Sequence, residues 1–158
     1  TRVGSGPMPT EMDSDTAHKL REIAGEYGVT TGRARRIGWF DGVAGRYSQA
    51  INGFTSMVIT RLDILDKFPA IKYCVGYEID GERVNHFIPN ASYLQKVSPV
   101  YEELKGWDQS TYGITKLEDL PKEARIYLEK LESLVGCRLG AVSTGPRREQ
   151  TIILDQIN

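Results

Sequence analysis

The sequence contains few cysteines, few histidines, almost no net charge and no long apolar run. Its 158 residues include 2 cysteines and 2 histidines, and 20 Lys and Arg offset 21 Asp and Glu, for a formal charge of −1. Cys74 and Cys137 match no metal or redox spacing, which predicts buried, unreactive thiols in a reducing cytoplasm. The near-neutral charge excludes a global field that attracts nucleic acid or an anionic membrane, so any anion site must be local.

No stretch approaches the roughly 20 apolar residues that cross a bilayer, and no signal-peptide pattern opens the chain. We therefore expect a cytoplasmic protein with no membrane partner. The chain does not begin with Met, and its opening TRVGSGPMP is typical of a loop, so we expect a segment of a longer polypeptide. With 40% apolar residues, residues 1–158 are predicted to form one domain that buries about two thirds of its unfolded surface.

Helical and extended patterns alternate along the chain, which predicts a mixed α/β domain with at least five short strands and about three helices. Helices are expected over residues 10–27, 39–51 and 117–134, ending at Gly28, Gly53 and Gly136. A buried strand is expected over residues 56–60, and a hairpin in residues 71–89 with its turn at Asp80 and Gly81. Two more strands are expected in RLGAVSTGP and TIIL, near the end of the chain.

The stretch VTTGRARRIGW, residues 29–39, concentrates positive charge and hydroxyl groups in one turn. Thr30, Thr31 and Gly32 offer hydroxyl and backbone N–H donors. Arg33 and Arg35 can each direct two N–H groups onto a carboxylate or a phosphate, which indicates an anion-binding loop. The alternative is a solvated basic turn that neutralises the negative end of the preceding helix, where a cation is worth roughly 0.3–1 kcal/mol.

Two further loops could bind a nucleotide base. In VITRLD, residues 58–63, the Asp63 carboxylate can accept the N1–H and the N2 amine of guanine, an edge that adenine lacks, and Arg61 can lie along the base. In AVSTGP, residues 141–146, the backbone at Ser143, Thr144 and Gly145 could approach a planar base or a phosphate. Taken alone, each pattern also fits an ordinary turn after a strand.

Together these loops lie within five segments that resemble the carboxy-terminal portion of adenylosuccinate synthetases. The segments are TRVGSGPMPTE, GEYGVTTGRARRIGW, TRLDILD, PVYEELKGW and STGPRREQTIIL. The resemblance covers essentially the whole chain. It implies a part of a larger P-loop-like, GTP-dependent ligase, usually a homodimer, that condenses IMP with L-aspartate in purine biosynthesis and requires Mg²⁺.

The same resemblance assigns roles to individual residues. It implies that the aspartate carboxylates are bound by Val29, Thr30, Thr31, Gly32, Arg33, Ala34 and Arg35. It implies that IMP is contacted by Arg33 and Val3. It implies that GTP is contacted by Arg35, Arg61, Leu62, Asp63, Ser143, Thr144 and Gly145.

The sequence departs from the family in two respects. Arg61 stands where the family usually has Lys, and we expect guanine specificity to survive because Asp63 carries the base recognition. The family's glycine-rich phosphate loop, with its catalytic aspartate, magnesium ligand and catalytic histidine, has no counterpart, and no GDEGKGK-like run occurs. His18 is expected on a helix face and His86 in a hairpin. We therefore predict no catalytic residue and no metal ligand in this segment, and no turnover by the segment alone.

Two alternatives to a synthetase segment remain at this stage. One is a stand-alone nucleotide-binding module that keeps the recognition loops without the reaction. The other is a nucleic-acid binder that uses the basic turn with Arg147 and Arg148. The near-neutral charge and the lack of a basic face interleaved with aromatic residues argue against nucleic acid as a partner.

Overall fold

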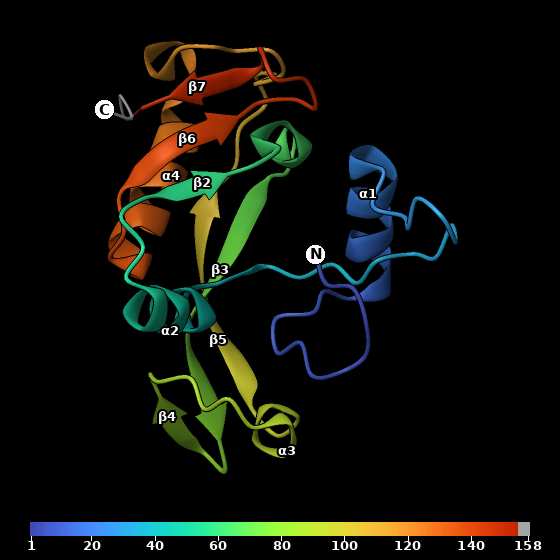
Figure 1. The fold of residues 1–158 in the computed structure, drawn as a ribbon, viewed down its shortest axis with the longest axis vertical. Coiled ribbons are helices and arrows are strands. Elements are labelled where there is room, and N and C mark those ends of the chain that lie inside the picture. Colours follow the sequence, from blue (N-terminus) through green and yellow to red (C-terminus); the bar gives the residue numbers. More distant parts are fainter. Residues whose placement is uncertain (155–158) are drawn as a thin grey trace. The chain divides into compact units, whose positions relative to one another are not determined.

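The structure, a computed structural model, describes residues 1–154 and has the mixed α/β class predicted from the sequence (Figure 1). The helices in this range are α1 (Ser14–Ala24), α2 (Gly42–Asn52), α3 (Ala91–Leu94) and α4 (Lys122–Val135), with 3₁₀ turns at Leu62–Leu65 and Leu117–Asp119. The strands are β1 (Phe40–Asp41), β2 (Met57–Ile59), β3 (Ala70–Ile79), β4 (Glu82–Val84), β5 (Ser98–Lys105), β6 (Leu139–Ser143) and β7 (Thr151–Ile153). None of the helices described is long and apolar enough to cross a membrane.

The described chain forms two compact units, each made of two separate segments. The first unit contains Thr1–Ala44 and Lys72–Glu102. The second contains Gly45–Ile71 and the chain from Glu103 onward. Cys74, in the first unit, and Cys137, in the second, are both buried free thiols, as predicted.

The sheet of the first unit is built on β3. Strand β1 pairs with it in parallel, β4 pairs with it antiparallel, and β5 also pairs with it. The turn between β3 and β4 falls at Asp80 and Gly81, with φ of 52° and 81°. Positive φ at both central residues is the conformation that Asp-Gly favours in two-residue hairpins, so the predicted hairpin is confirmed.

A hydrogen-bond network at Asp41 connects this sheet to the start of α2. The Tyr77 hydroxyl donates to Asp41 Oδ2 at 2.6 Å, while Oδ1 accepts the N–H groups of Val43 and Ala44 at 3.1 and 3.0 Å. Capping of this kind starts a helix, so the helix begins at Gly42 rather than at residue 39 as predicted. The adjacent buried cluster consists of Val43, Cys74, Tyr77 and Val97.

Helix α1 is shorter than the predicted range of residues 10–27. Asp13 caps its start by accepting the N–H groups of Asp15 and Thr16. Gly25 ends it in the left-handed conformation with φ of 66°, three residues before the predicted stop at Gly28. Gly25 is the first glycine after the apolar residues of the helix, and it adopts the left-handed conformation that commonly ends a helix. The spacing of apolar residues alone could not indicate which glycine would end it.

The second unit contains a mixed sheet in which β6 pairs in parallel with β2 and antiparallel with β7. Helix α4 lies along one side of this sheet (Figure 1). Val142 and Ile152 are fully or nearly fully buried, whereas Val58 and Ile153 are 57% and 64% exposed. The predicted strand at residues 56–60 is therefore confirmed as a strand but wrong as a buried one, because one of its faces is open.

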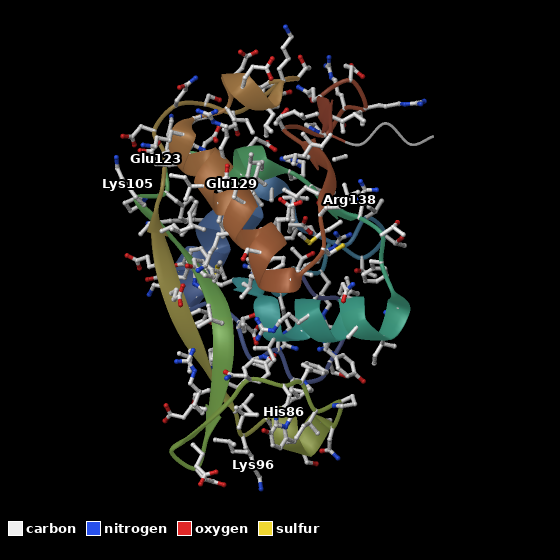
Figure 2. All side chains as sticks on the ribbon, turned by 90° about the vertical axis from the view of Figure 1, so that its left-hand side faces the viewer. His86, Lys96, Lys105, Glu123, Glu129 and Arg138 are labelled. Atoms are coloured by element: carbon white, nitrogen blue, oxygen red, sulfur yellow. The ribbon has the colours of Figure 1, made fainter. Side chains whose placement is uncertain are left out.

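The predicted helix over residues 117–134 is divided at Pro121. A 3₁₀ turn covers Leu117–Asp119, and α4 starts only after Pro121, whose ring nitrogen cannot donate within a helix. Gly136 ends α4 with φ of 71°, as predicted. At the start of α4, Glu123 pairs with Lys105 of β5 at 3.1 Å, and the two labelled side chains lie side by side in Figure 2.

Candidate functional site

The predicted anion-binding turn is a hydrogen-bonded loop in the first unit. The N–H of Gly28 donates to the Arg33 carbonyl at 2.9 Å, and the N–H of Gly32 donates to the Gly28 carbonyl at 2.8 Å. Gly32 has φ of 63°, which glycine adopts without the steric cost paid by other residues. Tyr27 and Ala34 form a bridge at the base of the loop. The loop therefore has a defined conformation set by its own backbone.

The tip of this loop presents its donors to solvent. Val29 is 98% exposed, and Thr30, Thr31 and Arg33 are exposed as well. Thr31 Oγ1 accepts the N–H of Arg33 at 3.3 Å. Within residues 1–154 the Arg33 guanidinium makes no hydrogen bond or ion pair. Its five N–H donors are thus available to an anionic ligand.

Arg35 is partly engaged by the protein itself. Its Nη1 donates to Glu26 Oε2 at 2.8 Å, and its backbone N–H and carbonyl bond to Glu26 and Arg21 at 3.0 and 2.9 Å. Its Nε–H is buried and has no partner among the described residues. Arg35 is therefore held in place on one side, and the N–H groups of Nη1 and Nη2 that are not bonded to Glu26 can serve a ligand.

Arg36 connects the amino-terminal segment to the residues that directly follow the loop. Its Nε and Nη2 donate to the two oxygens of Glu11 at 2.8 and 2.5 Å, and Nη1 donates to the Gly6 carbonyl at 2.6 Å. These bonds lower the pKa of Glu11 and raise that of Arg36. The Arg36 backbone also pairs with Arg2, directly before the 78% exposed Val3. The three arginines of the turn thus differ: Arg33 is exposed, Arg35 is shared and Arg36 is structural.

The predicted guanine-binding residues of the second unit are joined by hydrogen bonds. The backbone N–H of Arg61 donates to Ser143 Oγ at 2.8 Å, which connects the end of β2 to the end of β6. Arg61 Nε and Nη2 donate to Asp63 Oδ1 and Oδ2 at 3.1 and 3.2 Å. Leu62, between them, is 1% exposed and anchors the turn. The structure therefore brings Ser143 beside Arg61, 82 residues earlier in the chain, while Asp63 lies only two residues from Arg61.

Thr144 and Gly145 form the buried start of the loop after β6. The Thr144 hydroxyl donates to the Ile114 carbonyl at 2.7 Å, and its N–H donates to the Gln150 carbonyl at 2.9 Å. A Cβ atom at Gly145 would collide with the Gln150 side chain. The Thr144 hydroxyl is therefore engaged by the protein backbone, whereas the Ser143 hydroxyl accepts the backbone N–H of Arg61.

Sequence reasoning missed Asp66, which anchors this region. Asp66 Oδ1 accepts Trp107 Nε1–H at 2.7 Å and the Thr111 hydroxyl at 2.8 Å. Its Oδ2 accepts the Thr111 N–H at 2.8 Å and the Ser110 hydroxyl at 3.1 Å. Asp66 directly follows the 3₁₀ turn that carries Asp63. No local signal could have identified it, because its partners lie more than 40 residues along the chain.

Residues 1–154 contain no group of three or more His, Cys, Asp or Glu side chains that could hold a metal ion. His18 lies exposed on α1, and His86 lies exposed just after β4.

Comparison with known proteins decides the family. The family model described as adenylosuccinate synthetase matches residues 1–152. The chain belongs to the adenylosuccinate synthetase family. It is 51% identical over 152 residues to the adenylosuccinate synthetase of Dehalococcoides mccartyi strain BAV1, covering 96% of this chain. It is 48% identical over 157 residues to that of Alkaliphilus metalliredigens, covering 99% of this chain.

A solved structure of the same family has a closely similar fold. The fully ligated adenylosuccinate synthetase from Plasmodium falciparum is 32% identical, with a TM-score of 0.92 over 98% of this chain. The chain spans only about 36% of the bacterial synthetase from Dehalococcoides mccartyi and 37% of the Plasmodium chain. The two groups of candidate residues described above thus belong to a part of an adenylosuccinate synthetase fold.

Proposed function

We propose that this chain is the carboxy-terminal, substrate-binding portion of an adenylosuccinate synthetase. Residues 1–158 would then make up one domain of the larger enzyme. The reaction joins IMP and L-aspartate into adenylosuccinate while GTP is converted to GDP and phosphate. The observation that carries the proposal is the Asp63 carboxylate. Its side chain is only 9% exposed and lies on a turn bonded to Ser143.

Asp63 has the chemistry of a guanine reader. A carboxylate offers two acceptors side by side, and guanine offers N1–H and N2–H donors with matching spacing. Low exposure strengthens such bonds, because a buried polar partner left unpaired is costly. Arg61 and Leu62 would flank the base, with Ser143, Thr144 and Gly145 covering it.

The loop of residues 29–35 would bind the other substrates. The Arg33 guanidinium, exposed and without a partner among residues 1–154, would reach both the aspartate carboxylates and IMP, near which Val3 would lie. Arg35 would share its guanidinium between Glu26 and a ligand. Reactants of like charge need such positioning and charge stabilisation before they can react.

The remaining chemistry belongs outside the described residues. GTP phosphorylates O6 of IMP, and the aspartate amine then displaces that phosphate. Mg²⁺, when bound, supplies charge neutralisation at the phosphates. We propose that its ligands and a P-loop-like phosphate loop lie in the rest of a homodimeric, cytoplasmic enzyme, and that this segment alone does not turn over.

Asp63→Asn tests guanine recognition in the complete polypeptide. The amide replaces one acceptor with a donor, so we expect weaker GTP binding and a shift toward xanthosine triphosphate, whose C2 oxygen accepts that donor. Asp108→Asn, at an exposed position in the same unit, is the matched control. Unchanged preference for GTP over xanthosine triphosphate in Asp63→Asn would contradict the assignment.

A further inference from the structure

The Asp63 carboxylate is already occupied in the structure. Arg61 Nε and Nη2 donate to its two oxygens at 3.1 and 3.2 Å, so that one guanidinium bonds both acceptors. The Arg61 side chain is 29% exposed and that of Asp63 only 9% exposed. The guanidinium therefore covers the carboxylate that a base would have to reach.

The occupying group has the same donor pattern as the expected ligand. The N1–H and N2–H donors of guanine flank a single carbon, as do the Nε–H and Nη2–H donors of arginine. Both present a planar, paired set of N–H groups that fits a carboxylate side by side. They cannot bind the same face of Asp63 at the same time.

The backbone at this position is held independently of the side chain. Arg61 has φ of 57° and ψ of 51°, an unusual left-handed conformation for a residue other than glycine. Its N–H is bonded to Ser143 Oγ at 2.8 Å. Release of Asp63 thus requires rotation of the Arg61 side chain alone, without any change in the turn.

We propose that Arg61 is a built-in competitor of the guanine base. It occupies Asp63 until GTP displaces it, and the side chain at position 61 thereby sets the affinity for GTP. This inference rests on the proposed function, since it takes Asp63 as the residue that reads guanine.

Arg61→Lys is the decisive variant in the complete polypeptide. Lysine keeps the positive charge, but its single ammonium cannot form the paired contact. The dissociation constant of GTP, measured by calorimetric titration, is expected to fall by about fivefold, the value of a partly exposed ion pair. Arg83→Lys on β4 makes the same exchange outside the site and should leave GTP binding unchanged. Arg61→Gln, which also lacks the guanidinium, serves if Arg61→Lys does not fold.

A double-mutant cycle separates competition from any other effect of Arg61. In an Asp63→Ala background there is nothing to compete for, so Arg61→Lys should no longer tighten GTP binding. Equal or weaker GTP binding by Arg61→Lys, with Asp63→Ala still impaired, would overturn the inference and leave the proposed function intact. GTP binding that is unaffected by Asp63→Ala would instead remove the proposed function and this inference together.

Discussion

Replacing Asp66 with alanine should destabilise the second unit severely. The carboxylate accepts four hydrogen bonds, from Trp107 Nε1, the Thr111 N–H, and the hydroxyls of Thr111 and Ser110. Trp107 and Thr111 are 3% and 0% exposed, so water has little access to their donors once the carboxylate is removed. The two N–H donors cannot rotate toward other partners. At about 1–3 kcal/mol for each buried donor left unsatisfied, the expected loss is about 4 kcal/mol.

Urea unfolding of the complete polypeptide, followed by circular dichroism, measures this loss. A change of this size is a large part of the roughly 5–15 kcal/mol that stabilises a typical protein. Asp108→Ala removes an exposed carboxylate nearby and should change stability by less than about 0.5 kcal/mol. Asp66→Asn should fall between the two, because the amide retains one acceptor. A loss below about 1 kcal/mol for Asp66→Ala would refute the reasoning, since even one orphaned donor costs that much.

Two further predictions concern the first unit. Arg33→Ala should weaken L-aspartate binding by at least about tenfold with little change in melting temperature, because the guanidinium has no partner in residues 1–154. Arg36→Ala should mainly lower the melting temperature, because it removes the bonds to Glu11 and Gly6. The reverse pattern in steady-state kinetics and thermal unfolding would contradict both roles. The bond from Arg36 holds the pKa of Glu11 below its ordinary 4.5, so the pair stabilises the fold above that pH and loses its effect as the pH falls through the lowered pKa. Glu11→Gln should therefore lower the free energy of unfolding by less than about 1 kcal/mol near pH 7, and this difference from wild type should vanish in acid. A difference in stability that does not depend on pH would exclude the ion pair as its cause.

Much of the candidate site could be anticipated from the types of residue in short loops. The donors of residues 29–35 and the carboxylate of Asp63 are properties of the side chains themselves. The sequence did not show which of these groups are already bonded to other parts of the protein. Arg33 and Arg36 are three positions apart in one basic turn, yet only Arg36 is consumed by Glu11, which lies 25 residues away. Charge pattern indicates which groups could bind an anion, whereas the path of the chain decides which of them remain available.

The sequence by itself determined those features whose physical cause acts over a few residues. Asp80 and Gly81 specify the hairpin because both tolerate positive φ, and Gly136 ends α4 for the same reason. Tertiary structure alone decided the contacts between distant segments: Trp107 with Asp66, 41 residues apart, and Ser143 with Arg61, 82 residues apart. Such contacts have no local signature, because each partner is an ordinary polar group until folding removes water and brings the other beside it.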